Sequence, residues 1–72
     1  MEQKLETFLA LCQTMHYGRA AELLNLSQPA VSKHIKALET EYAVQLFTYT
    51  ARRLHKTRAG ELLEQYAVSL RY

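Results

Sequence analysis

A chain of 72 residues has room for one small domain and excludes folds that are built on a large sheet. Its hydrophobic fraction of 49% and its charged fraction of 22% are those of a globular protein and exclude a disordered tail. The net charge is only +2, but the segment from Thr48 to Arg58 contains four cations and no acid, which favours a polyanionic partner such as nucleic acid.

The residue types from which many active sites are built are scarce. The sequence has no aspartate, so a Ser-His-Asp set cannot be assembled, and its two glycines do not form a phosphate-binding loop. The one cysteine excludes a disulfide framework and suits a reducing compartment. The apolar run of residues 8–12 is too short for a membrane span or a signal-peptide core. We therefore expect a cytoplasmic protein that is not an enzyme and needs no cofactor or membrane.

The first two predicted elements are helices. Two glutamates near the start, Glu2 and Glu6, suit the positive end of the first helix dipole. Residues 16–18 break the pattern, and a shorter helix is expected over residues 19–24 with Gly18 as its N-cap. The buried face of the first helix follows from apolar residues that recur three and four positions apart, which are Leu5, Phe8, Leu9, Cys12 and Met15.

The third predicted helix, over about residues 28–42, has a polar and basic face. It follows a tight turn at residues 25–26, with Ser27 as N-cap and Pro29 in the first turn, where a missing N–H costs nothing. Its buried face is predicted to consist of Val31, Ile35, Leu38 and Tyr42. The helical rotation places five residues on the opposite side, which are Gln28, Pro29, Ser32, Lys33 and Lys36.

A short hairpin and a fourth helix complete the chain. Residues 46–50 are rich in β-branched and aromatic side chains, residues 51–53 make a polar tip, and residues 54–56 return. Thr57 is the predicted N-cap of the last helix. The apolar stripe of that helix runs to the last residues, so we expect the chain to end within the helix, and the stripe consists of Ala59, Leu62, Leu63, Tyr66, Ala67 and Leu70.

Two short helices joined by a tight turn, the second with a basic exposed face, predict a helix-turn-helix. With the basic hairpin, the fold class is mainly α, a winged helix-turn-helix with a three-helix core, a short hairpin wing and a long C-terminal linker helix. The DNA-binding domain would span residues 1–57 and the linker helix residues 58–72. The helix of residues 28–42 would enter the major groove of double-stranded DNA, and the wing of about residues 48–56 would lie on the backbone or in the minor groove.

The sequence also resembles the LysR-type transcriptional regulators. The resemblance covers nearly the whole chain without gaps. It lies in Ala20-Ala21-Glu22-x-Leu24-x-Leu26-Ser27-Gln28-Pro29-Ala30-Val31-Ser32-Lys33-x-Ile35-x-x-Leu38-Glu39, then in Val44-Gln45-Leu46-Phe47, in Arg52-Arg53 and in Thr57-Arg58-Ala59-Gly60.

The resemblance implies partners and an assembly. Regulators of this family are bacterial and carry a C-terminal effector domain, absent here, that binds a small co-inducer. They dimerise through the linker helix, form tetramers at full length and bind interrupted inverted repeats. A stripe of about three turns is also more than a small core can cover, which independently favours a partner helix. The residues expected to pair are Leu62, Leu63, Tyr66 and Leu70.

Individual DNA contacts follow from the same resemblance. The residues that match the base-reading positions are Gln28, Pro29, Ser32 and Lys33. Those that match backbone or wing positions, or lie on the same basic face, are Ser27, Lys36, Arg52, Arg53 and Thr57.

Five positions depart from the family pattern. Lys33 replaces an arginine, which exchanges a bidentate grip on guanine for a point charge. Ala43 replaces a glycine that ends the recognition helix in a left-handed conformation. Tyr49 replaces an arginine, and His34 replaces a glutamine. Lys56 replaces an apolar residue, so its stem would have to pass along the hairpin to reach water.

Other interpretations predict different properties. Cys12 and His16, four apart, could bind a metal ion together with His34 or His55, but a buried structural Cys12 is the stronger interpretation, and we expect no metal site. A protein-interaction module on the same scaffold would lack salt-dependent DNA affinity. An enzyme or ligand sensor would need a pocket with convergent titratable groups.

Overall fold

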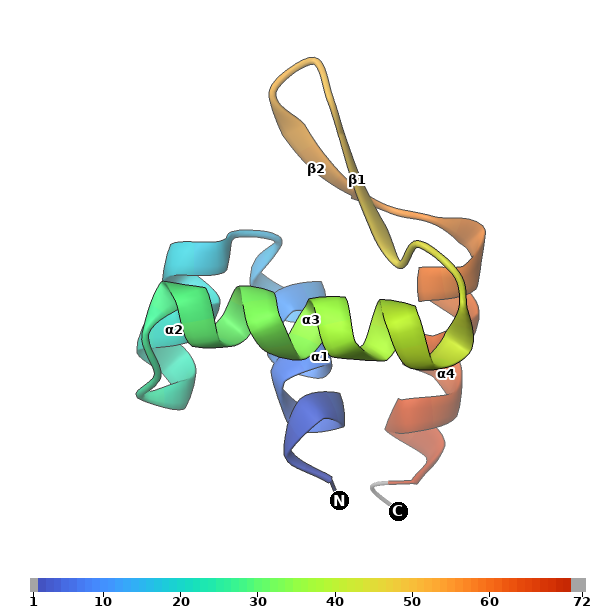
Figure 1. Ribbon diagram of the computed structural model, residues 1–72, viewed down its shortest axis with the longest axis horizontal. Coiled ribbons are helices and arrows are strands. Elements are labelled where there is room, and N and C mark those ends of the chain that lie inside the picture. Colours follow the sequence, from blue (N-terminus) through green and yellow to red (C-terminus); the bar gives the residue numbers. More distant parts are fainter. Residues whose placement is uncertain (1, 71–72) are drawn as a thin grey trace.

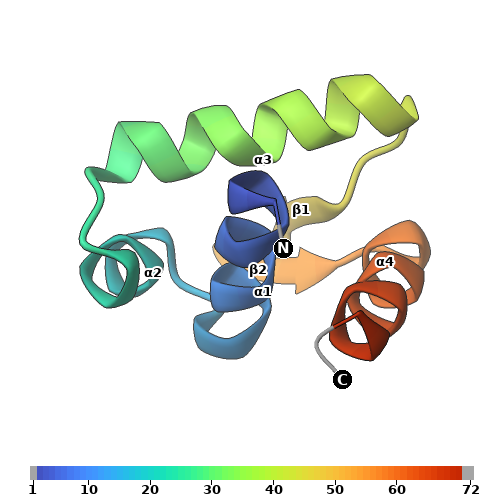
Figure 2. The ribbon, with the colours of Figure 1, turned by 90° about the horizontal axis from the view of Figure 1, so that it is seen from below.

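The structure, a computed structural model, describes residues 2–70 and consists of four packed helices and a two-stranded hairpin. The elements are α1 (Gln3–Thr14), α2 (Tyr17–Leu24), α3 (Gln28–Tyr42), β1 (Phe47–Thr50), β2 (Arg53–Lys56) and α4 (Arg58–Ser69). Helix α1 packs on α2, α3 and α4, and α2 also packs on α3. Figure 1 shows the hairpin rising away from the helices, and in Figure 2 α1 lies between α2 and α4 beneath α3. This arrangement is a winged helix-turn-helix, as the sequence predicts.

The core lies where α1 meets the other helices and the base of the hairpin. Phe8 and Leu11 of α1 are fully buried, together with Val31 and Leu38 of α3. The ring of Phe8 also packs on that of Phe47 in β1, with centroids 5.6 Å apart, which joins the first helix to the hairpin. The buried faces predicted for the first helix and for most of the third are therefore confirmed, except that Met15 lies beyond α1 at its C-cap and is only partly buried.

Helix α2 begins two residues earlier than predicted. It starts at Tyr17, and its N-cap is His16, whose Nδ1 accepts a hydrogen bond of 3.1 Å from the backbone N–H of Arg19. Gly18 is not the cap but lies in the first turn. A Cβ at Gly18 would lie 3.1 Å from Cε1 of His16, so the glycine leaves room for the capping ring. Histidine is not among the residues usually preferred at N-caps, and for that reason the N-cap preferences favour Gly18 over His16 in this sequence.

The end of helix α3 confirms one expectation and corrects another. Ala43 adopts a left-handed conformation, with φ of 56°, and the N–H of Val44 bonds to the carbonyl of Glu39. A non-glycine residue in this conformation costs about 1–2 kcal/mol. Tyr42, predicted to be buried, is 44% exposed. Figure 2 shows α1 beneath the middle of α3, so the last turn of α3 extends beyond the helix that would cover it.

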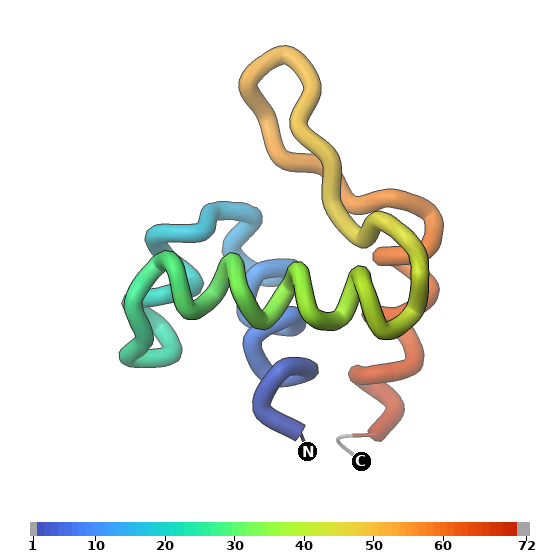
Figure 3. The backbone as a smooth tube through the Cα atoms, viewed as in Figure 1, coloured from blue at the N-terminus to red at the C-terminus, as the bar shows by residue number. Residues whose placement is uncertain are grey.

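The hairpin is tighter than predicted. Thr50 pairs with Arg53, which therefore belongs to β2, and the tip consists of two residues, Ala51 and Arg52. Both have positive φ, 51° and 62°, the pattern of a two-residue hairpin turn that usually selects Asn-Gly. Leu46 precedes the strand and is buried in the core. The tube in Figure 3 shows how far this hairpin, the wing (residues 47–56), stands from the helices.

The apolar stripe of helix α4 divides between two faces. Gly60 and Ala67 are buried, and Ala59 and Leu63 pack against the core. The outward residues Leu62, Tyr66 and Leu70 are each at least half exposed. The helix ends at Ser69 although Leu70 keeps helical backbone angles, and the expectation for residues 71–72 lies outside the described part of the chain.

The backbone N–H and C=O of one residue, Leu46, join helix α3, the wing and helix α4. The N–H of Leu46 donates to a carboxylate oxygen of Glu39 at 2.8 Å, and the carbonyl of Leu46 accepts from the N–H of Thr57 at 3.0 Å. Gly60 lies against the same carbonyl, because a Cβ there would be 2.3 Å from the oxygen. Thr57 adds a bond from its hydroxyl to the carbonyl of Gln45, at 2.6 Å. We call these residues the Leu46 junction.

The junction predicts the effect of a methyl group at Gly60. Gly60→Ala should lower the free energy of unfolding by about 1–3 kcal/mol, because the new Cβ overlaps the carbonyl of Leu46, a residue whose N–H and C=O are both held by hydrogen bonds. Gly18→Ala is the matched control, since its nearest contact is a movable side chain, and it should stay within about 1 kcal/mol of the parent. Urea unfolding followed by circular dichroism measures both, and equal stabilities would contradict the prediction.

Candidate nucleic-acid interface

The outward face of helix α3 presents polar and cationic side chains without interruption. Val31, Ile35 and Leu38 point into the core and are at most 2% exposed. The predicted base-reading residues lie on the other side, and all of them are exposed, as is Lys36: they are Gln28, Pro29, Ser32 and Lys33. Figure 1 shows this helix at the front of the molecule with the wing directly above it. The fold therefore brings together the predicted residues of the helix and of the wing.

The cationic side chains predicted to contact DNA form no ion pairs with other described residues. The four ion pairs between described residues involve Lys4, Lys56 and Arg58 as cations. Lys33 and Lys36 on α3, and Arg52 and Arg53 on the wing, are therefore available to an external anion. All four are exposed. A mixture of unpaired cations on a helix and on an adjacent hairpin is typical of a surface that binds a phosphate backbone.

A cleft of about 520 Å³ separates the wing from the helix-turn-helix. Its cationic groups, Arg52 and Arg53, come from the wing, while Gln28 enters from the first turn of α3. Tyr17 and Tyr49 face the cleft from the helical and the wing side. Burial raises the pKa of Tyr17, with smaller contributions from Glu39 and Tyr49, so its hydroxyl stays protonated and can donate. The full lining is Met15, His16, Tyr17, Gly18, Gln28, Tyr49, Arg52, Arg53 and Leu54.

The hydroxyl groups of Ser27 and Thr57, both predicted to contact DNA, differ in whether the hydroxyl proton remains available to a phosphate. Both side chains cap helices as expected: Ser27 accepts from the N–H of Ala30 at 3.2 Å, and Thr57 accepts from Gly60 at 3.0 Å. The proton of the Thr57 hydroxyl is already given to Gln45. Thr57 is therefore suited to holding the base of the wing, and Ser27 is the better donor to a phosphate.

Several residues of this region carry functions that the sequence did not indicate. Glu39 appears in the sequence only as an acid near the end of the helix, yet it caps the Leu46 junction. The sequence pattern indicates only a break between helices at His16 and Tyr17, but both residues line the cleft. A signal was present for Lys56, a cation where the family has an apolar residue, and the structure supplies its partner, Glu64, at 2.7 Å.

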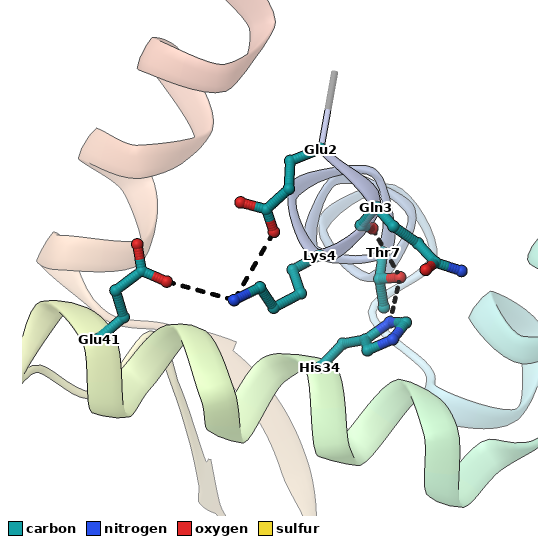
Figure 4. Close-up of polar contacts among 6 residues, drawn as sticks. All are labelled: Glu2, Gln3, Lys4, Thr7, His34 and Glu41. Atoms are coloured by element: carbon teal, nitrogen blue, oxygen red, sulfur yellow. Dashed lines mark hydrogen bonds and ion pairs between the residues drawn. The ribbon is translucent and has the colours of Figure 1, made fainter.

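Three of the four side chains considered for a metal site, Cys12, His16 and His34, are separately engaged. Cys12 is buried, and burial together with Glu64 raises the pKa of its thiol to about 12, against a lowering by Lys56, so the thiolate that binds metals is not formed at neutral pH. His16 caps α2, and His34 lies with Nδ1 2.8 Å from the hydroxyl of the buried Thr7 (Figure 4). His34 thus packs at the edge of the core. Between residues 2 and 70 no group of three or more His, Cys, Asp or Glu side chains could hold a metal ion.

No helix in the described part of the chain has the length and apolar character needed to cross a membrane.

Comparisons with known proteins agree with this geometry. A family model described as "Bacterial regulatory helix-turn-helix protein, lysR family" matches residues 3–61. The HTH-type transcriptional regulator HdfR of Salmonella newport (strain SL254) is 48% identical over 66 residues, which are 92% of this chain and 24% of HdfR. The chain thus spans about a quarter of the length of that curated relative.

Solved structures show the same fold. A transcriptional regulator of the LysR family from Eggerthella lenta DSM 2243 has a TM-score of 0.89 at 52% identity, covering 96% of this chain and 97% of its own. The BenM DBD in complex with catB site 1 DNA has a TM-score of 0.89 at 34% identity, over 97% of this chain and 80% of its own. The CbnR DBD–DNA complex has a TM-score of 0.88 at 30% identity, over 97% of this chain and 82% of its own.

The buried thiol predicts how stability depends on alkaline pH. An unfolded cysteine ionises near its ordinary pKa of 9.0, whereas the folded thiol ionises near 12. The unfolded state therefore loses protons first, and the contribution of Cys12 to stability is complete below pH 9 and is lost as the pH rises toward 12. Urea unfolding across this range should show a steeper decline for the parent than for Cys12→Ala. Parallel curves would contradict the burial of the thiol.

Proposed function

This chain belongs to the LysR family of bacterial regulatory helix-turn-helix proteins, and from this premise we propose that it is the domain of a transcriptional regulator that binds double-stranded DNA sequence-specifically. The observation that carries the proposal is the continuous exposed surface of α3 and the wing, on which Lys33, Lys36, Arg52 and Arg53 are unpaired within the described chain. Relatives solved as DNA complexes have the same fold at 30–34% identity. A regulator of this kind works in the cytoplasm and needs no catalytic residues of its own in this domain.

The proposed reading of bases depends on the first turns of α3. Gln28 can donate and accept at the edge of adenine, and Pro29 can lie against a thymine methyl group. Ser32 and Lys33 follow on the same exposed face one turn later. Lys33 would contact guanine as a point charge rather than as a bidentate fork, so discrimination at its base should be weaker than with arginine.

The proposed backbone contacts surround the cleft. One DNA strand would pass between α2 and the wing, with Arg52 and Arg53 on its phosphates and the hydroxyl of Tyr49 in place of the arginine usual for the family. Ser27 and Lys36 would contact phosphates on the α3 side. Thr57 would support the wing through its bond to Gln45 rather than touch DNA.

We further propose a dimer through helix α4. The exposed residues Leu62, Tyr66 and Leu70 form an outward apolar row, while Leu63 is occupied by the core and would contribute only at the edge. Pairing two such helices about a two-fold axis would set two recognition helices on an inverted repeat. The family resemblance implies a co-inducer domain and tetramers for full-length regulators. This chain matches about a quarter of such a regulator, the curated relative HdfR.

The first functional prediction concerns salt. The logarithm of the DNA-binding constant should fall linearly with the logarithm of the salt concentration, by about 0.9 for each neutralised phosphate. Arg53→Ala should reduce this slope by about one unit and leave the preferred sequence unchanged. Fluorescence anisotropy at several salt concentrations measures the slope. A parent chain without salt-dependent affinity would instead favour a protein-interaction module.

The second functional prediction concerns sequence reading. Gln28→Ala should cost about 1–3 kcal/mol at one base pair and relax the preference there, because only that base loses its partner. Selection from random duplex DNA, carried out with parent and variant, compares the preferences. A uniform loss over all sequences would mean that Gln28 only positions the helix.

The third functional prediction concerns the dimer. Tyr66→Glu should keep the helical content of the parent and weaken both self-association and binding to a two-site duplex, because a charge would enter the apolar row. Leu23→Glu is the matched control, since Leu23 is similarly exposed but lies on α2. Sedimentation and gel shifts on one-site and two-site duplexes measure the effect. If Tyr66→Glu and Leu23→Glu behave alike, the dimer uses another surface.

A further inference from the structure

A cation occupies an inward position of the wing. Lys56 pairs with Phe47 in the antiparallel register, and residues that pair directly lie on the same face of a hairpin. Phe47 is buried on that face, whereas the neighbours of Lys56 on the other face, His55 and Arg53, are exposed. The alternation of the strand thus directs Lys56 toward the helices and away from the face of His55 and Arg53.

Helix α4 supplies a carboxylate, that of Glu64, which pairs with Lys56. The Nζ of Lys56 lies 2.7 Å from Oε1 of Glu64, and the two side chains are only 27% and 28% exposed. The other ion pairs that join separate elements or turns are longer and more exposed: Lys4–Glu41 spans 3.3 Å and Arg58–Glu61 spans 3.6 Å. Partial burial strengthens a short, charge-assisted hydrogen bond, and the bond to Glu64 raises the pKa of Lys56. Cys12 of α1 lies near enough that both charges affect its thiol.

The wing has few other attachments. Its base is held by the Leu46 junction and by the contact of Phe47 with Phe8, and Leu54 of β2 packs against the core. Beyond these contacts its strands project away from the helices (Figures 1 and 3). Four strand residues at about 3.3 Å each place the tip about 13 Å from the base, so a rotation of about 10° at the base moves Arg52 by about 2 Å. A bond that fixes the angle between the wing and the helices at the base of the wing therefore decides where Arg52 and Arg53 lie.

We propose that the ion pair between Lys56 and Glu64, the wing–α4 ion pair, fixes the angle of the wing relative to helix α4 and thereby positions Arg52 and Arg53 for DNA. Lys56 and Glu64 are positioning residues and do not touch DNA themselves. The inference rests on the proposed function, because the position of the wing matters only if the wing binds a partner. It also links the wing physically to the helix on which the proposed dimer depends.

Neutralising the acid tests this proposal most sharply. Glu64→Gln makes the domain more positive by one charge, so simple electrostatics predicts tighter binding to DNA. Loss of the wing–α4 ion pair predicts the opposite, a several-fold weaker binding with a smaller salt slope. Glu41→Gln is the matched control, because it makes the same charge change at an exposed pair, Lys4–Glu41 (Figure 4), and should bind as tightly as the parent or more tightly. The probe is a random-sequence duplex of defined length, titrated at several salt concentrations.

Two further measurements separate positioning from a role in folding. In Glu64→Gln, hydrogen exchange should speed up in the wing while the amides of α1 and α3 keep their protection. The exchanged pair Lys56→Glu with Glu64→Lys should restore the slow exchange and much of the affinity.

The outcomes are distinguishable. A parent chain that does not bind DNA would contradict the proposed function, independently of the ion pair. A binding parent with a Glu64→Gln variant of equal or greater affinity and unchanged wing exchange would overturn the positioning role. If Glu64→Gln and the exchanged pair both fail to fold, the ion pair serves the fold and the proposal is likewise overturned.

Discussion

The backbone of Leu46 is the constraint on which the arrangement of this domain depends. Its N–H is held by Glu39 of α3, and its carbonyl is held by the N–H of Thr57 at the start of α4. Gly60 presses against the same carbonyl, where no side chain fits. Because the wing begins one residue after Leu46 and ends one residue before Thr57, these contacts set the recognition helix, the wing and the linker helix relative to one another.

The chain uses its glycines for close contact and leaves its turns to other residues. Both glycines lie inside helices, and in the described residues no glycine has positive φ. The ends of α1, α2 and α3 and the hairpin tip are instead made by non-glycine residues in left-handed conformations, and a non-glycine residue there costs about 1–2 kcal/mol. At the hairpin tip, Ala51-Arg52 places an arginine on the proposed DNA surface, where the more usual Asn-Gly would carry no charge. The left-handed residues are Met15, Asn25, Ala43, Ala51 and Arg52.

Charge is distributed so that the two sides of the fold serve different purposes. On the outward side of α3 and at the outer end of the wing, Lys33, Lys36, Arg52 and Arg53 lack ion-pair partners among the described residues and remain exposed. On the side of α1 and α4, Lys4 and Lys56 are paired with Glu41 and Glu64, and the outward row of α4 is apolar. A polyanion and a second apolar helix can therefore approach this small domain from different directions without competing for the same side chains.

The sequence by itself determined what depends on neighbours three or four residues away: the four helices, the caps at Ser27 and Thr57, the polar face of α3 and the basic hairpin. Only the tertiary structure decided which apolar residues are covered, because burial depends on which element arrives from elsewhere. Tyr42 has the right period but lies in the last turn of α3, beyond the part of α3 that α1 covers, and the stripe of α4 exceeds what α1 can cover. The cap at His16 and the partner of Lys56 were likewise invisible, since an imidazole is an uncommon cap and Glu64 meets Lys56 only after the wing has folded back onto α4.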